Sequence, residues 1–293
     1  MPPALSNPAM SPILDFIEPY DFSPTLVIVC ALAAVLYARG RRALAGDPER
    51  PGFWRALAYF LGLALIYMVM HTRIDYISQH MFWVHRAQHL VLHHLAPFLI
   101  MLSVPQAAIA RGLPDAARRV LIPLWHSKPV QFGYRVVQFP IISAGLFVGL
   151  IFFWLTPSIH FDAMLSLTRY KAMNWSMALD GLLFWWLIVN PEPRGHGNVG
   201  FGWRILLLWI ITVPQIWLGA HIALHPGVMY DVYNVCGRAW PVSPLVDQQI
   251  GGLITWIPAS MMGVLAAVVV LRLWLLDSAR LRAPESPVAR AVA

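Results

Sequence analysis

Long apolar stretches alternate with short polar segments along the chain. Seven of them are long enough to cross about 30 Å of hydrocarbon as helices, which takes about 17 to 25 residues each. They are Phe22–Ala38, Ala56–Thr72, Met81–Val104, Val136–Leu155, Met173–Asn190, Ile205–His225 and Ile250–Leu276. This pattern predicts an all-α, polytopic membrane protein, folded as a single bundle of about seven transmembrane helices.

The composition agrees with a membrane protein. Hydrophobic residues make up 58% of the 293 residues and charged residues only 12%, and the mean hydropathy of +0.61 is too high for a water-soluble domain. The net charge of +7 comes from basic residues scattered among short loops, so we expect a lipid bilayer and no nucleic acid as partner. Cys30 and Cys236 provide no disulfide framework.

The distribution of lysine and arginine predicts the orientation in the membrane. With the N-terminus outside and the C-terminus cytoplasmic, sixteen of the 21 basic residues lie on the cytoplasmic side, as the positive-inside rule requires. We expect an outer leader over residues 1–21 that is not a cleaved signal peptide, a transmembrane domain over 22–276, and a disordered cytoplasmic tail over 277–293. Part of the cytoplasmic link 105–135 is expected to lie as an amphipathic helix in the headgroup plane.

Five histidines lie between residues 80 and 94, where the third apolar stretch begins. His85, His89 and His93 are four residues apart and therefore share one helix face. Imidazoles inside hydrocarbon need ligands, polar partners or water, so this stripe indicates a metal site, with hydration at the interface as the alternative. His93 and His94 point about 100° apart. We expect His93 to face the site, and His94 to be a structural hydrogen-bonding residue.

A second pair of histidines with the same spacing, His221 and His225, ends the sixth apolar stretch. In the predicted orientation this pair lies at the same outer level as His85 and His89. Two such pairs on different helices are able to supply the three or four ligands of a metal site between helices. His71, at the outer end of the second stretch, is a further candidate ligand; the alternative is a simple terminal residue.

Imidazole and thioether groups gather in the outer half of the predicted bundle. Nine of the eleven histidines lie there. Seven methionines lie at the same level, namely Met68, Met70, Met81, Met164, Met173, Met177 and Met229. This ligand set suits copper, and thioether ligands favour Cu(I).

Three carboxylates are candidates for orienting the metal ligands. Asp180 lies inside the fifth apolar stretch, at the depth expected for His89, and we expect it to hold a ligand histidine in place. A structural polar contact is the alternative. Asp162 and Asp247 lie at outer helix mouths, where each is placed to ligate a metal, to cap a helix or to do neither.

The motifs of the third and seventh stretches resemble those of a known family. Residues 85–89 (His-Arg-Ala-Gln-His), followed by 95–99 (Leu-Ala-Pro-Phe-Leu) and by Pro105, look like the central motif of the CtaG-type cytochrome c oxidase assembly factor family. Residues 247–256 (Asp-Gln-Gln-Ile-Gly-Gly-Leu-Ile-Thr-Trp) resemble its other hallmark. The seven-helix layout between about residues 24 and 276 is also similar.

The resemblance implies an integral protein of the bacterial inner membrane that helps to mature haem-copper oxidases. It implies delivery of Cu(I) to the copper-bearing subunit of cytochrome c oxidase, with a periplasmic copper chaperone as a further partner. In the mechanism that we expect, the ion is held by His85, His89, His221 and His225, or by a subset of them, and leaves by ligand exchange. No Gly-x-Ser-x-Gly, Walker A or His-Glu-x-x-His motif occurs, so we expect no enzyme.

The chain departs from the family at the outer end of the fifth stretch. Histidines are frequent there in the family, whereas this chain has Asn174, Trp175, Ser176 and Ala178, which argues against ligation from that helix. The alternatives are a copper transporter with helices broken at Pro214 and Pro258, a haem-binding redox protein, and a scaffold that only docks oxidase subunits. The sequence carries no signal for an oligomeric state.

Overall fold

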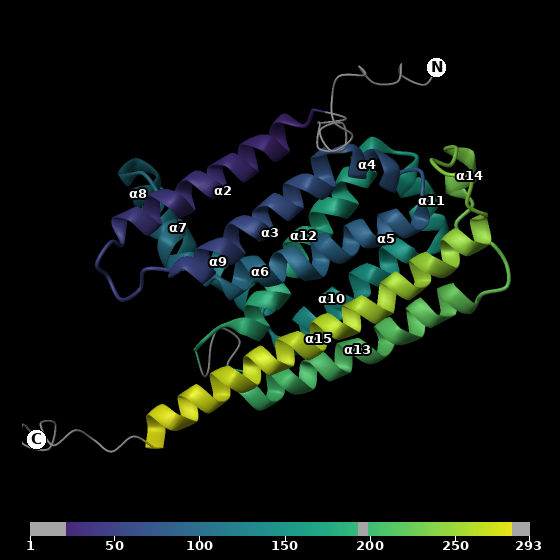
Figure 1. Ribbon diagram of the computed structural model, residues 1–293. Coiled ribbons are helices and arrows are strands. Elements are labelled where there is room, and N and C mark those ends of the chain that lie inside the picture. Colours follow the sequence, from purple (N-terminus) through teal and green to yellow (C-terminus); the bar gives the residue numbers. More distant parts are fainter. Residues whose placement is uncertain (1–21, 193–198, 283–293) are drawn as a thin grey trace, which may run out of the picture.

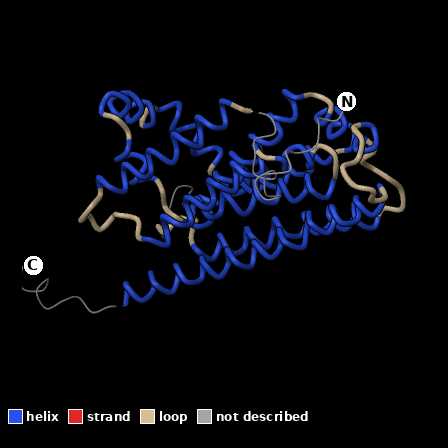
Figure 2. Tube along the Cα trace, turned by 45° about the horizontal axis from the view of Figure 1, so that its top comes forward, coloured by secondary structure: helices blue, strands red, loops and turns tan. Residues whose placement is uncertain are grey.

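The computed structural model describes residues 22–192 and 199–282, and within these ranges the protein is helical without any strand (Figures 1 and 2). The elements are α2 (Pro24–Ala43), α3 (Phe53–His71), α4 (Arg73–Ser78), α5 (Phe82–Leu90), the π-helix η1 (Val91–Leu95), α6 (Ala96–Leu102), α7 (Gln106–Gly112), α8 (Asp115–Trp125), α9 (Lys128–Val137), α10 (Pro140–Leu155), α11 (Pro157–Met164), α12 (Leu167–Val189), α13 (Phe201–Leu224), α14 (Val232–Val235) and α15 (Pro244–Arg282). The expected leader lies outside the described residues, as do residues 283–293 of the expected tail.

Five helices are long and apolar enough to cross a membrane, namely α2, α3, α12, α13 and α15. Two bent segments raise the number to seven if each is one span: Phe82–Leu102 with α7, bent by 76°, and α9 with α10, bent by 66°. The prediction of an all-α polytopic membrane protein is therefore confirmed, with five to seven candidate spans. Its orientation stays a prediction.

The third span lies at the centre of the bundle (Figure 1). The segment α5–η1–α6 packs against α3 and α4, against α12, and against α15, which also lies along most of α13. The short helices α4, α11 and α14 gather at one end, called here the α14 end, whereas α7 and α8 lie at the opposite end (Figure 1). The segment α5–η1 is therefore surrounded by other helices of the bundle.

Two of the last helices contain a proline but are not broken by it. Pro214 lies inside α13 and Pro258 inside α15, and both helices continue through these positions. The helix breaks on which the transporter alternative relied are therefore not present. α15 is also longer than the predicted Ile250–Leu276, because polar residues continue the helix to Pro244 and Arg282.

The π-helix η1 interrupts the third span next to a proline. Pro97 has no N–H, so it cannot donate to the carbonyl of His93, which would be its partner in an α-helix. The indole Nε1 of Trp185 donates to that carbonyl instead, at 3.0 Å. Gly181 lets α12 approach the same carbonyl, because a Cβ at position 181 would lie 2.6 Å from the His93 oxygen.

Large apolar side chains cover the outward faces of the bundle. On α13 the exposed side chains include Trp209, Val213 and Trp217, which are four residues apart. Such a stripe suits contact with lipid. The link 105–135 forms α7, α8 and part of α9, and no residue of α8 or α9 is buried. A helix in this link is confirmed, and its place in the headgroup plane stays a prediction.

Candidate functional site

Four histidines form a buried column along the third span. We call His85, His89, His93 and His94 the histidine column. The first two lie on the regular helix α5 and the other two on η1. All four side chains are buried, with at most 5% of their surface exposed. The predicted stripe of histidines on the third apolar stretch is therefore enclosed inside the bundle, where it forms a buried polar site.

His85 is the member of the column whose ring makes no hydrogen bond. Neither Nδ1 nor Nε2 has a hydrogen-bond partner within the described part of the chain. The backbone of Ser78 lies beside the ring without hydrogen-bond geometry. The ring centroids of His89 and His160 are 4.3 and 5.1 Å away. Because a buried polar group without a partner is costly, this ring is suited to receive a ligand.

His89 is held by two neighbours that define its tautomer. Its Nε2 lies 3.0 Å from Oδ1 of Asn174, and its Nδ1 lies 3.4 Å from Nη1 of Arg86. An arginine only donates hydrogen bonds, so Nδ1 accepts and Nε2–H donates to the asparagine. Asn174 is one of the positions where the chain departs from the family, and it contacts the column directly.

His160 on α11 completes a cluster of three rings, and sequence reasoning did not select it as a ligand. Its Nδ1 donates to the carbonyl of Trp154 at 3.0 Å, and its Nε2 accepts from the hydroxyl of Tyr233 at 2.9 Å. Burial lowers the pKa of His160 to about 4, so the ring is neutral near pH 7. The only sequence signal was its place among the histidines of the predicted outer half.

Asp180 is the carboxylate that orients a histidine of the column. Its Oδ2 lies 3.0 Å from Nε2 of His93, and the His93 ring stacks on Phe147 with centroids 3.9 Å apart. The predicted contact between this carboxylate and a histidine is therefore present, but the partner is His93 rather than His89. α12 begins at Leu167, six residues before the predicted Met173, so Asp180 lies further along the helix from the α14 end than counting from Met173 gave.

His94 is hydrogen-bonded as predicted, with its Nε2 3.2 Å from Oε1 of Gln215 on α13. The expectation that only one of the two adjacent histidines faces the site is wrong. Both His93 and His94 line one small cavity, together with Arg86, His89 and Met177. The wider turn of η1 reduces the angle between successive side chains below that of an α-helix.

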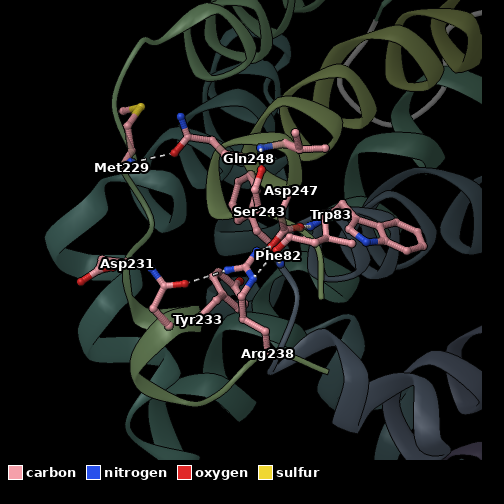
Figure 3. Close-up of polar contacts among 12 residues, drawn as sticks. Phe82, Trp83, Met229, Asp231, Tyr233, Arg238, Ser243, Asp247 and Gln248 are labelled. Carbon is pink, nitrogen blue, oxygen red and sulfur yellow. Dashed lines mark hydrogen bonds and ion pairs between the residues drawn. The ribbon is translucent and has the colours of Figure 1, made fainter. Parts of the chain in front are cut away.

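The start of the 247–256 motif packs against the N-terminus of α5, directly before the 85–89 motif (Figure 3). The carboxylate of Asp247 accepts hydrogen bonds from the backbone N–H groups of Phe82, at 3.0 Å, and Trp83, at 2.8 Å, and forms an ion pair with Arg238. It therefore caps the N-terminus of α5, although it belongs to α15. Of the roles considered for Asp247, helix capping is the one observed.

Further contacts join the same two helices beside the column. The buried Arg86 donates from Nε to the hydroxyl of Thr255 at 3.0 Å. A Cβ at Gly251 would overlap the ring of Phe82, so only glycine allows α15 to lie this close to α5. The 247–256 motif thus fixes the start of α5 and the position of Arg86.

The segment between α13 and α15 covers the α14 end of the site. Tyr230 stacks on Phe82 with ring centroids 4.2 Å apart and donates to the carbonyl of Leu155 at 2.8 Å. Gln248 accepts from the backbone N–H of Met229 at 2.6 Å (Figure 3). Together with the hydrogen bond from Tyr233 to His160, these contacts cover the rings of His85, His89 and His160 at the α14 end.

The structure does not bring His221 and His225 to the column. His221 is exposed on α13 and stacks on Trp217, with centroids 5.4 Å apart. His225 is half-buried at the helix end, and its Nδ1 contacts the backbone of Gly227. The two rings are 5.7 Å apart. The predicted joint site of both histidine pairs is therefore wrong, because α13 presents His221 to the outside, in line with its tryptophan stripe.

The other predicted site residues lie apart from the column. His71 is buried at the end of α3, with its ring beside Phe22 and Tyr67. Asp162 is exposed and pairs with Arg169 at 3.2 Å. Within residues 22–192 and 199–282, no three His, Cys, Asp or Glu side chains are arranged to hold a metal ion.

The fold and the site define a class: an integral membrane protein with a closed imidazole cluster inside its helix bundle. The sequence profile of the cytochrome c oxidase caa3 assembly factor family matches residues 35–277. The chain belongs to this family, which confirms the resemblance and places both packed motifs within the matched region.

The curated relatives that the chain matches come from mycobacteria. It is 27% identical to an uncharacterized protein of Mycobacterium bovis and to one of Mycobacterium tuberculosis, each over 267 residues that cover 86% of this chain and 39% of the relative. An uncharacterized protein of Mycobacterium leprae is 25% identical over 279 residues, which cover 89% of this chain and 40% of the relative. The chain therefore spans about two fifths of the length of these relatives. No solved structure gives a significant match.

Proposed function

We propose that this protein is a non-enzymatic assembly factor that binds copper as cargo in its histidine column and delivers it to cytochrome c oxidase. Membership of an oxidase assembly factor family supports the oxidase as the target. The observation that carries the copper assignment is His85, a fully buried imidazole whose two nitrogens lack hydrogen bonds within the described residues and which lies between His89 and His160.

The donor chemistry of the site fits Cu(I). The cavity beside the column is lined by imidazoles of His89, His93 and His94 and by the thioether of Met177. Soft ligands of this kind favour the cuprous ion. A closed tetrahedral cage would hold the ion too tightly for transfer. Here His85 is free to bind first, whereas His89 and His160 have to exchange their present hydrogen bonds for the metal, which suits stepwise ligand exchange.

The proposed topology determines where the cargo enters. With the N-terminus outside, the α14 end faces the periplasm of a bacterium whose inner membrane contains the protein. Copper then arrives from a periplasmic chaperone and leaves to the copper-bearing oxidase subunit. The contact of Tyr233 with His160 has to open for either step, because that hydroxyl covers the cluster at this end.

The alternative functions have less support. A haem between helices needs far more space than the cavity of about 10 Å³ beside His93 and His94, and His93 already bonds to Asp180. A carrier with broken helices lacks its structural basis, because α13 and α15 are continuous.

The proposal is tested with His85→Gln/His89→Gln in cells that depend on this protein for their oxidase. We expect normal amounts of the variant in the membrane but oxidase that lacks copper and activity, because glutamine keeps polar groups but removes both imidazoles. The matched control is His221→Gln/His225→Gln, which changes a pair with the same spacing on the surface.

We expect the control variant to mature oxidase like the unmodified protein. Full copper loading of the oxidase by the column variant would refute the proposal. Equal loss in both double variants would also refute it, since the buried column would then have no special role.

A further inference from the structure

A small cavity lies deeper along the third span than the His85 cluster. Its volume is about 10 Å³, which is close to the space that a single water-sized sphere needs. It is lined by Arg86, His93, His94, Met177 and Thr255, among others. A cavity of this size with several polar side chains in its lining is able to hold one small ligand, either a water molecule or a metal ion.

The hydrogen bonds of the two adjacent histidines leave the same atom free on each ring. Nε2 of His93 donates to the carboxylate of Asp180, and Nε2 of His94 donates to the amide oxygen of Gln215. The proton of each neutral ring is thereby placed on Nε2, so Nδ1 keeps a lone pair. Neither Nδ1 has a hydrogen-bond partner among the described residues.

This arrangement has the form of a metal site with its supporting groups in place. Histidines that bind metals through one nitrogen usually donate the other N–H to a carboxylate or carbonyl oxygen. The ring centroids of His93 and His94 are 5.0 Å apart, a span that one ion bridges with metal–nitrogen bonds of about 2 Å. Met177, which is buried on α12, adds a thioether to the lining.

We propose that this cavity is a Cu(I) site whose ligands are Nδ1 of His93, Nδ1 of His94 and the sulfur of Met177. Two imidazoles and one thioether make a three-coordinate, soft ligand set. The site rests on the proposed function, and it names the deep position at which the cargo is held after passing His85 and His89.

The charges around the cavity set how firmly the ion is held. Asp180 contributes a carboxylate next to His93, which offsets the charge of the ion. Arg86 lines the same cavity and forms no ion pair with any described acidic side chain, so its guanidinium opposes a second cation. This repulsion lowers the affinity for Cu(I), which suits an ion that has to be released.

The test uses the full-length protein in detergent, loaded anaerobically with Cu(I) alone and studied by X-ray absorption at the copper edge. We expect one copper per chain, with nitrogen ligands and one sulfur ligand. Met177→Leu has nearly the same volume, so it folds, and it should lose the sulfur signal. Met173→Leu, a buried methionine one turn away that does not line the cavity, is the matched control and should keep it.

Two further variants test the nitrogen ligands and the carboxylate that supports them. Asp180→Asn removes the charge behind His93 and should lower the Cu(I) affinity about 10- to 100-fold, measured by competition with a coloured chelator. His94→Gln should abolish retention of the ion. A sulfur signal that persists in Met177→Leu, or unchanged affinity in His94→Gln, would overturn the site, as would wild-type protein that binds no copper.

These results separate the deep site from the proposed function. If Met177→Leu and His94→Gln bind copper normally while His85→Gln/His89→Gln fails to mature the oxidase, the deep site is wrong and the proposed function stands. If the deep site binds copper as described but oxidase maturation is independent of His85 and His89, the site stands and the proposed function is wrong.

Discussion

Single residues hold the site together from helices that are distant in sequence. Asp247 is the clearest case, because one carboxylate on α15 caps α5 and pairs with Arg238 from the preceding segment. The side chain of Arg238 is 15% exposed and that of Asp247 is 1% exposed. Such a charge, removed from water and satisfied by several donors, is costly to disturb.

Asp247→Asn should therefore lower the free energy of unfolding by about 2–4 kcal/mol, because it removes the charge from two N–H groups and from Arg238. Thermal unfolding in detergent measures the effect. Asp162→Asn is the matched control, since Asp162 forms an exposed ion pair with Arg169 and should change stability by less than about 1 kcal/mol. Equal effects of the two variants would contradict the capping role.

At the residue scale, the sequence was sufficient for some side chains and not for others. The helical spacing of His85, His89 and His93 gave a buried stripe, as observed. The same spacing misplaced His221, although a signal was present, because Trp217 and other exposed apolar residues precede it at intervals of four. Residue spacing tells which side chains share a face of one helix. Which face points into the bundle depends on how the neighbouring helices pack.

At the scale of elements, η1 decides which groups meet. Pro97 frees the carbonyl of His93, Trp185 bonds to it, and Gly181 brings α12 next to it. The proline was visible in the sequence, but a π-helix is only one of several responses to a missing N–H. The shared cavity of His93 and His94 lies at this π-helix, which regular helical geometry does not predict. The pairing of Asp180 with His93 follows from the early start of α12 at Leu167.

Gly181→Ala should destabilise the protein by about 1–3 kcal/mol, because the new methyl group would meet the His93 oxygen and Pro97. The matched control is Gly149→Ala, also inside a helix, where nothing lies within 4 Å of the new Cβ. This change should leave stability equal or raise it by up to about 1 kcal/mol. The unfolding midpoint should thus fall for Gly181→Ala and not for Gly149→Ala, and a neutral Gly181→Ala would contradict the close packing.

At the scale of the whole molecule, apolar patterning was enough to predict the helix class and the approximate spans. It was not enough for the helix ends and bends, such as the 66° bend between α9 and α10, because these depend on prolines and on tertiary packing. The orientation of the bundle rests on the charge distribution. It determines whether the covered α14 end, and with it the histidine cluster, faces away from the cytoplasm.

The thiol of Cys236 reports this orientation. It lies half-buried after α14, whereas Cys30 is buried on α2. A maleimide that does not cross membranes should label Cys236 in intact spheroplasts, and Cys236→Ser should abolish labelling. Burial raises the pKa of the Cys236 thiol, so the thiolate forms at higher pH than in an exposed cysteine. The labelling rate should therefore reach half of its maximum above about pH 8.5, the ordinary thiol pKa at which an exposed cysteine reaches it. Labelling only after permeabilisation would invert the orientation.

The most direct test of the central claim is the ratio of copper to haem in cytochrome c oxidase purified from cells with His85→Gln/His89→Gln, beside oxidase from cells with His221→Gln/His225→Gln. A buried imidazole column that supplies copper predicts a low ratio in the first preparation and a full ratio in the second. A full ratio in both preparations would contradict the account.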